Sequence, residues 1–368
     1  MIYRLYGKTG ERVSLLGFGG MRFQDIENRD ECVETMMVAA RAGVNYFDTA
    51  LRYFGGKSEM IFGEAFTEMK HQGFPFLCAT KTTATSEKEI RSNLETQLKR
   101  MKLDKIDFYH VWCVTDLMDW KERKRKGVLQ AFLRMKEEGL IRHVCLSSHL
   151  VEDEIEELLK EDVFEGVLLG YSAYNFSFRR KALEAITRRG LGCVVMNPLG
   201  GGLIPRHPER FDFVRTREDE TVVDGALRFL FAHENIHVVL VGAENPQQMQ
   251  EAVSSLEGYQ PIPKEKIEEI KTHIDQSFEG LCTGCRYCEV CPEGIPVSKM
   301  VNAYNYKLLE DDEKAVLQRI QWDWNIPPQE AEKCVGCGAC EEACTQHLMI
   351  MEILKDISQM RKRVRSLE

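Results

Sequence analysis

The sequence has no run of 18 or more uninterrupted apolar residues, so it does not predict a transmembrane helix. It also has no excess of positive charge, because 49 lysines and arginines face 58 acidic residues, for a formal net charge of -9. This balance argues against broad affinity for phosphate backbones or anionic membranes. We therefore expect no nucleic-acid or membrane partner. The opening stretch "MIYRLYGKTGERV" lacks the apolar core of a signal peptide, and we expect a cytoplasmic protein.

Cysteine is scarce before residue 282 and dense after it, since eight of the 13 cysteines fall between residues 282 and 344. The odd total and the missing export signal make a disulfide framework improbable, so the dense group indicates metal ligation. Scattered cysteines usually pack as small hydrophobic side chains. The scattered ones are Cys32, Cys78, Cys113, Cys145 and Cys193.

Short apolar runs rich in β-formers alternate with amphipathic helical stretches between residues 12 and 255, as in parallel βαβ units. Eight such pairs in about 250 residues predict an α/β fold, a (β/α)8 TIM barrel with its active site at the carboxyl ends of the strands. A doubly wound open sheet is the alternative, although "GFGGMR" lacks the third glycine of a nucleotide fingerprint. The predicted strands are residues 14–19, 45–48, 75–81, 106–112, 141–147, 166–171, 192–197 and 237–242.

The chain is longer than a single hydrophobic core usually serves, so we expect a second, smaller domain. The prolines in "YQPIPKEK" precede a charged helix and mark a boundary. We predict a barrel over residues 1–258, a linker helix over 259–278 and a small domain over 279–368 that holds the dense cysteines.

Polar side chains stand at the ends of three predicted strands: Asp48 and Tyr53 in "FDTALRYFGGKSE", Lys81 in "CATKTT" and His110 in "DFYHVWC". A carbonyl that takes up hydride needs a proton donor at its oxygen, but a phenol titrates near about 10 and is a poor acid at neutral pH. We expect the Lys81 ammonium to lower the pKa of Tyr53, with Asp48 orienting and pairing the lysine.

These residues resemble the aldo-keto reductase family, and the resemblance covers most of residues 1–255. "FDTALRYFGGKSE" is similar to the family's Asp-x-Ala-x-x-Tyr-Gly-x-Ser-Glu block, and "ATKTT" to its strand-end lysine. The resemblance implies an oxidoreductase that reduces a small aldehyde or ketone by direct hydride transfer from NAD(P)H. Tyr53 would be the general acid, supported by Lys81 and Asp48.

Cofactor contacts follow from the same resemblance. NADPH is the family's usual cofactor, but Glu244 stands where a basic residue often meets the 2'-phosphate, which leaves NADP(H) and NAD(H) both open. Tyr171 occupies the place that usually holds glutamine before "YN", here Tyr174 and Asn175. The residues Gly20, Met21 and Arg22 in "GGMR" also resemble cofactor-side rim residues of the family. A purely structural Gly-Gly turn is an equal alternative to a cofactor contact here. The implied contacts are Gly20, Met21, Ser147, Ser148, Tyr171, Met196, Pro198, Leu199, Gly201, Gly242, Ala243, Gln248 and Glu251.

The fourth strand departs from the family's pattern. The family's Asp-x-Tyr-x-x-His spacing would place histidine five residues after Asp107, where this chain has Trp112. His110 comes two residues early, on the same face but about 6 to 7 Å deeper along the strand. His110 is our candidate for the fourth catalytic position, which a bulge or a bridging water would bring into reach. Otherwise His110 is a core residue and Trp112 shapes the substrate pocket.

The dense cysteines form two sets, C-x2-C-x2-C-x2-C-P and C-x2-C-x2-C-x3-C. Zinc sites generally pair two CxxC units across a longer gap, whereas thiolates at every third position suit a cubane cluster. The sets resemble a two-cluster bacterial ferredoxin, with a helical stretch between them as in the helical ferredoxin variant. The resemblance implies two [4Fe-4S] clusters with crossed ligation. One would be held by Cys282, Cys285, Cys288 and Cys344, and the other by Cys291, Cys334, Cys337 and Cys340.

The role of such clusters has two interpretations. Clusters move one electron at a time while nicotinamide moves two, and the sequence has no flavin signature to couple them. The first interpretation is a reductase whose clusters are coupled to turnover or stabilise the chain. The alternative is an electron-transfer or redox-sensing protein on a barrel with little reductase activity, which would need a partner protein.

Overall fold

The computed structural model describes residues 1–114, 117–148, 150, 152–173, 176–277, 281–282, 288–344 and 348–365. The chain forms two compact units. The barrel unit comprises Met1–Ala173, Arg179–Pro205 and Val214–Pro263, and the cysteine unit comprises Tyr174–Phe178, Arg206–Phe213 and Lys264–Glu368. The domain boundaries proposed above, at residues 258 and 278, stay predictions.

Eight parallel strands close into a barrel in the order β10-β3-β4-β5-β6-β7-β8-β9, and β10 pairs with both β3 and β9. The predicted TIM barrel is confirmed and the open sheet is excluded. No predicted strand end differs from the observed one by more than two residues, because buried β-rich runs bounded by turns are a strong local signal. The strands are β3 Leu16–Gly19, β4 Tyr46–Asp48, β5 Leu77–Thr82, β6 Ile106–Val114, β7 Ile141–Ser148, β8 Gly166–Gly170, β9 Gly192–Met196 and β10 Val238–Val241.

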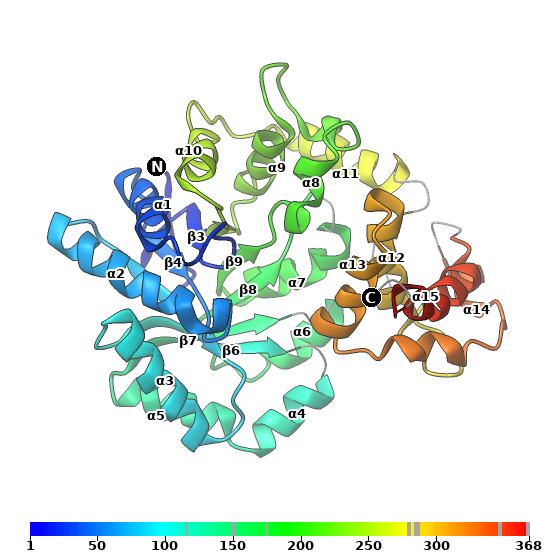
Figure 1. The fold of residues 1–368 in the computed structure, drawn as a ribbon, viewed down its shortest axis with the longest axis horizontal. Helices are drawn as coiled ribbons and strands as arrows, with labels where there is room; N and C mark the ends of the chain where they lie inside the picture. The colour runs from blue at the N-terminus through cyan, green and yellow to red at the C-terminus, as the bar shows by residue number, and fades with distance from the viewer. Residues whose placement is uncertain are drawn as a thin grey trace. The chain divides into compact units, whose positions relative to one another are not determined.

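Helices surround these strands (Figure 1). The helix after β5 shows how the sequence starts one: Ser86 caps it by accepting from the backbone N–H of Glu89 at 3.3 Å. The helices are α1 Arg29–Arg41, α2 Lys57–Gln72, α3 Glu87–Met101, α4 Leu117–Arg125, α5 Val128–Glu137, α6 Glu152–Leu159, α7 Phe176–Arg188, α8 Leu203–Arg206, α9 Val222–Phe231 and α10 Pro246–Ser254.

An N-terminal hairpin, absent from the sequence predictions, packs into the interior of the barrel. Its strands β1 (Tyr3–Leu5) and β2 (Arg12–Ser14) are antiparallel. Tyr6, in the turn, is fully buried in a cluster with side chains of the barrel interior. A Cβ on Gly166 would lie 2.0 Å from the Tyr6 hydroxyl oxygen and one on Gly192 2.2 Å from the Tyr6 ring, so this side chain requires glycine at both positions.

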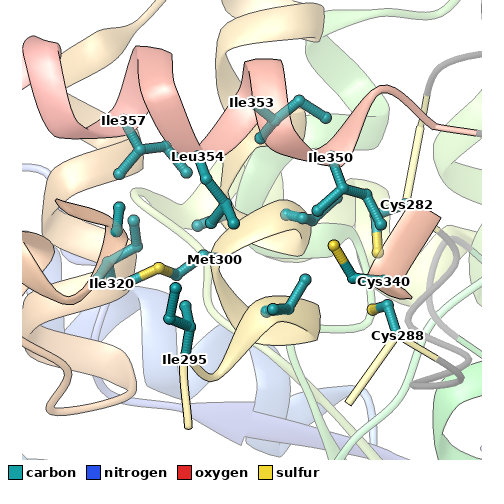
Figure 2. Close-up of a cluster of buried hydrophobic side chains, with 14 of the residues drawn as sticks. Cys282, Cys288, Ile295, Met300, Ile320, Cys340, Ile350, Ile353, Leu354 and Ile357 are labelled. Carbon is teal, nitrogen blue, oxygen red and sulfur yellow. The ribbon is translucent and has the colours of Figure 1, made fainter. Parts of the chain in front are cut away.

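The cysteine unit is helical around its own core. Its helix α12 is followed by Asp311 in the left-handed conformation, and Asp312 caps the next helix. Figure 2 shows Cys282, Cys288 and Cys340 beside the apolar side chains of this core. The elements are α11 Lys264–Ser277, α12 Val297–Glu310, α13 Glu313–Gln318, a π-helical turn Arg319–Asp323, a 3-10 turn Pro328–Lys333, α14 Ala339–Glu342 and α15 Ile350–Arg365.

In the part of the chain that the structure describes, no helix combines the length and apolar character needed to cross a membrane. Four of the five scattered cysteines are buried, as expected, and Cys113 is partly exposed.

Candidate active site

The strand ends bring the predicted polar residues together by simple alternation. Along a strand, residues two apart share a face, and several interior apolar residues are followed two positions later by a polar one. Tyr46 is followed by Asp48, Ala79 by Lys81, Phe108 by His110, and Cys145 by Ser147. The four polar side chains therefore form a layer above the apolar core, at the carboxyl ends of adjacent strands β4 to β7.

Lys81 and Asp48 form a buried ion pair in this layer. The Lys81 Nζ donates to Asp48 Oδ1 at 2.5 Å, and the two side chains are 1% and 5% exposed. Burial lowers the pKa of Lys81, but the charges of Asp48 and Tyr53 and the hydrogen bonds to both residues together outweigh burial, and the net pKa is raised. The lysine therefore keeps its proton at neutral pH, as its predicted role requires.

Tyr53 begins the 3-10 turn Tyr53–Gly56 after β4, and its ring centroid lies 5.4 Å from Lys81 Nζ. Burial raises the pKa of Tyr53, and the Lys81 charge opposes this without cancelling it. The net direction is opposite to the expectation from sequence, because desolvation of the phenolate outweighs the nearby ammonium. Since the residue as a whole is only partly buried, part of Tyr53 remains open to a substrate.

His110 is fully buried, and its Nδ1 lies 3.2 Å from the carbonyl oxygen of Thr80. Burial and the nearby Lys81 charge lower the pKa of His110 to about 3, so the ring is neutral. Trp112 lies at the mouth instead, edge-on to the Tyr53 ring with centroids 5.9 Å apart. A β-bulge is present in β6, but it comes after Val111 and therefore does not bring His110 nearer the mouth.

A buried polar network behind the strands supports Lys81. The Gln97 Nε2 donates to the Lys81 carbonyl oxygen at 3.1 Å and to Glu59 Oε1 at 2.9 Å. Thr80 Oγ1 also donates to Glu59, and Tyr109 donates to Gln97 Oε1 at 2.8 Å. Sequence reasoning missed this network because its members lie on four separate elements, α2, β5, α3 and β6, and no local motif joins them.

Three buried polar atoms of the mouth have no hydrogen-bond partner among the described residues: Asp48 Oδ2, His110 Nε2 and Ser147 Oγ. Buried polar groups are usually satisfied, so such atoms at strand ends fit a site that its ligand completes. Ser148, also fully buried, instead accepts from the Leu150 N–H at 3.0 Å. Ser147 is therefore the better placed of the two predicted serines to receive a carboxamide.

Tyr171, another predicted contact, has its hydroxyl 3.3 Å from His233 Nε2. Its predicted neighbours Tyr174 and Asn175 lie outside the described residues. A contact with nicotinamide would use the remaining hydrogen-bonding capacity of this hydroxyl or the face of the Tyr171 ring.

The loop after β9 contains a run of glycines with positive φ, from 64° at Gly200 to 99° at Gly202. The left-handed region admits side chains poorly, so this turn depends on glycine. Such a turn exposes backbone amides that an anion can approach. The predicted contacts here are Met196, Pro198, Leu199 and Gly201, of which only Pro198 is buried.

After β10, Gly242 is exposed, Ala243 is buried, and Gln248 and Glu251 lie exposed on α10. Gln248 is held by Glu244, whose backbone N–H donates to Gln248 Oε1 at 3.0 Å.

The glycines of this rim pack tightly. A Cβ on Gly242 would lie 2.6 Å from the Arg22 side chain. The aliphatic part of Arg22 therefore packs directly over Gly242, and its guanidinium contributes a positive charge to this rim. A Cβ on Gly20 would lie 2.5 Å from Phe62, which gives Gly20 a packing role, and Met21 beside it is exposed.

In the cysteine unit, the predicted ligands differ in exposure. Cys337 is exposed and Cys291 and Cys334 are partly buried, whereas Cys285 lies outside the described residues. The buried ones pack in the core shown in Figure 2 and are Cys282, Cys288, Cys340 and Cys344.

The local structure fits a cluster. Asn305, on α12, fixes the backbone of Cys282 through two hydrogen bonds of 2.8 and 3.0 Å. The predicted donors of both cysteine sets are all thiols, and each thiolate of a cubane cluster binds a different iron.

Comparison with known proteins agrees with both units. Residues 15–275 match the model of the aldo/keto reductase family, and residues 281–349 match that of a 4Fe-4S dicluster domain. Iron-sulfur ligation is therefore shown for the C-terminal region.

The chain is 24% identical over 303 residues to an L-galactose dehydrogenase of Arabidopsis thaliana, covering 74% of this chain and 94% of that protein. It is 23% identical to the uncharacterized oxidoreductase YqkF of Bacillus subtilis, over 75% and 97% of the two chains. The holo form of aldo-keto reductase AKR11C1 from Bacillus halodurans superposes with a TM-score of 0.63 at 25% identity, over 74% and 96%. The thermostable aldo-keto reductase Tm1743, at 22% identity, shares the fold with a TM-score of 0.63 over 74% and 99%.

Proposed function

The chain belongs to the aldo/keto reductase family and is an oxidoreductase, and from this premise we propose that it reduces an aldehyde or ketone with Tyr53 as proton donor. The observation that carries the proposal is the buried Lys81–Asp48 pair beside a partly exposed Tyr53. NAD(P)H, when bound, supplies the hydride.

The side chains of the site supply the proton, stabilise the charge that develops and position the reacting groups. The Tyr53 hydroxyl donates its proton to the carbonyl oxygen as negative charge develops there. The Lys81 ammonium stabilises the phenolate that remains, and Asp48 holds the lysine charged and oriented. Gln97 fixes the backbone of Lys81 from behind. Ser147, with its unpaired hydroxyl, is our candidate to orient the carboxamide of the nicotinamide.

The decisive test is Tyr53→Phe in anaerobically prepared protein. The variant keeps the ring and loses only the proton donor, so turnover should fall by at least about 100-fold while nicotinamide still binds. Tyr306→Phe, in the cysteine unit, is the matched control. Near-normal turnover by Tyr53→Phe would remove Tyr53 from this role. If wild-type protein shows no carbonyl-dependent oxidation of NAD(P)H, the electron-transfer or redox-sensing alternative replaces the reductase.

The fourth catalytic position is tested separately. If the neutral His110 polarises the carbonyl, His110→Ala lowers turnover by about 100-fold or more with folding retained. If turnover is unchanged and Trp112→Ala alters which carbonyls are accepted, His110 is a core residue.

The rim beside α10 carries both signs of charge that could select the cofactor. Arg22 crosses Gly242, and Glu244 lies next to Gln248. A 2'-phosphate would pair with the arginine, and the free ribose hydroxyls of NADH would donate to the carboxylate. Binding of NADPH and NADH to wild type and Arg22→Met decides between them. Selective weakening of NADPH indicates NADP(H), and unchanged binding of both excludes Arg22 from the contact.

For the cysteine unit we propose two [4Fe-4S] clusters with the crossed ligation given above. The dicluster family match over residues 281–349 and the donor set of eight thiols support this count. Analysis should find about eight iron and eight sulfide per chain. Half that content would reduce the count to one cluster. A visible band that bleaches when NAD(P)H is added anaerobically would indicate redox coupling, and an unchanged band a stabilising role.

Cysteines that bind clusters must remain reduced, and the cytoplasm is a reducing compartment, so we propose a cytoplasmic location.

A further inference from the structure

Strand β6 carries one residue more than its neighbour β7 near the mouth of the barrel. Val111 pairs with Leu146 and Val114 with Ser148, so Trp112 and Cys113 together stand opposite a single residue. Cys113 has a φ of 60°, in the left-handed region that residues with a Cβ seldom adopt. Bulges of this kind re-aim side chains and are frequent beside active sites.

Both residues of the bulge are neighbours of Tyr53. The Trp112 indole meets the phenol ring edge-on, with an interplanar angle of 86°. Cys113 lies close enough for its charge state to affect the pKa of Tyr53. The conformation of the bulge therefore determines part of the wall next to the proton donor.

Arg123, on helix α4, holds this bulge in place. Its Nη1 donates to the carbonyl oxygen of Trp112 at 2.8 Å, and its Nη2 to that of Cys113 at 3.4 Å. Its Nε donates to Asp119 at 2.9 Å, which orients the guanidinium from one turn earlier on the helix. Arg123 is 7% exposed, so these bonds are largely protected from competition by water.

Helix α4 is itself anchored on the same face. Trp120, three residues before Arg123, is 2% exposed and packs against Phe164 with ring centroids 5.7 Å apart. A guanidinium presents several donors in a rigid fork, whereas a lysine would present one compact ammonium. The position therefore requires arginine to engage two consecutive carbonyls.

We propose that Arg123 is a positioning residue that sets substrate specificity: by binding the carbonyls of Trp112 and Cys113 it fixes the bulge, and the bulge holds the indole as one wall of the pocket for the carbonyl substrate. The favoured substrates carry an apolar group that packs on this indole. The inference rests on the proposed carbonyl reduction at Tyr53.

The test compares Arg123→Met with Arg125→Met in the full chain with its clusters intact. Arg125 lies on the same helix with its side chain 73% exposed and pairs with the exposed Glu122, which makes it a matched control. The ratio of kcat/KM for an aromatic and a small aliphatic aldehyde should change by about 10-fold or more in Arg123→Met. It should stay at the wild-type value in Arg125→Met.

A second readout follows the indole without turnover. The chain has four tryptophans, so 5-fluorotryptophan labelling gives four fluorine resonances, and the one missing in Trp112→Phe belongs to Trp112. This resonance should shift or split in Arg123→Met, while those of Trp322 and Trp324 stay in place. The specificity effects of Arg123→Met and Trp112→Phe should not add in the double variant, because both act through one side chain.

Should Arg123→Met fail to fold, Arg123→Lys keeps the charge with fewer donors and should show the same changes at smaller size. An unmoved Trp112 resonance, an unchanged substrate ratio or additive effects would overturn the inference. Absence of carbonyl turnover in wild type would instead defeat the proposed function, and the fluorine resonance would still report whether Arg123 fixes the bulge.

Discussion

The barrel site and the cysteine unit differ in how they position their reactive side chains. In the barrel, strands β4 and β5 and a hydrogen-bonded network place Lys81, Asp48 and Tyr53 before any ligand arrives. In the cysteine unit, the described thiols range from buried to exposed. The barrel site is preorganised by the fold, whereas we expect the cysteine unit to be organised by what it binds.

The largest expected effect comes from removing iron. The cysteine unit has a small core in which Cys282, Cys288, Cys340 and Cys344 are themselves members, and structural metal sites supply on the order of 10 kcal/mol. Oxidative chelation should therefore let the amides of α12 and α15 exchange rapidly with deuterium while those of β5 and β6 remain protected. Continued protection of α12 and α15 without iron would erase the contrast between the two units.

The next effect comes from breaking the buried pair of the barrel site. Lys81→Met leaves the Asp48 carboxylate buried and unpaired, which should cost about 3–5 kcal/mol of unfolding free energy. Lys57→Met, which breaks an exposed pair with Glu27, should cost no more than about 1 kcal/mol. Chemical denaturation measures both.

The double variant Lys81→Met with Asp48→Asn separates stability from chemistry. It should recover most of the lost stability, because no charge is left buried, and it should remain inactive. If stability falls equally for Lys81→Met and Lys57→Met, the pair does not preorganise the site.

The smallest expected effect is the pH dependence contributed by His110. The pKa of His110 is about 3 in the folded protein against 6.5 ordinarily. Between these pH values the unfolded chain binds a proton that the folded chain does not bind. The associated stability is present above pH 6.5 and is lost as pH falls toward 3. Between pH 7 and pH 5 the loss should be about 2 kcal/mol, and His110→Gln should flatten the curve by that amount.

His71→Gln, at an exposed position on α2, is the matched control substitution. If the free energy of unfolding changes equally with pH in His110→Gln and in wild type, His110 takes up a proton in the folded protein.

A feature of this protein can be predicted from the sequence when the residues that encode it lie close together along the chain. The eight barrel strands and the positions of Asp48, Tyr53 and Lys81 are encoded in short stretches, because apolar runs and strand-end polar residues are local patterns. The bulge after Val111 has no signal in the neighbouring sequence, and its Trp112 carbonyl is bound by an arginine on the following helix. The direction of the Tyr53 pKa was wrong for a similar reason: burial is a property of the packed fold, not of neighbouring residues.

The N-terminal hairpin has a consequence for the order in which the barrel forms during synthesis. The Arg4 Nη1 donates to the carbonyl oxygen of His233 at 2.7 Å, across a separation of 229 residues. Since residue 4 is synthesised before residue 233, the hairpin must wait until nearly the whole barrel has been translated before it finds this partner. Closure of the barrel interior is therefore a late event with a long loop to close, and such non-local contacts slow folding. Until then the nascent chain presents Tyr6 and Val13 without the barrel side chains that bury them in the finished fold.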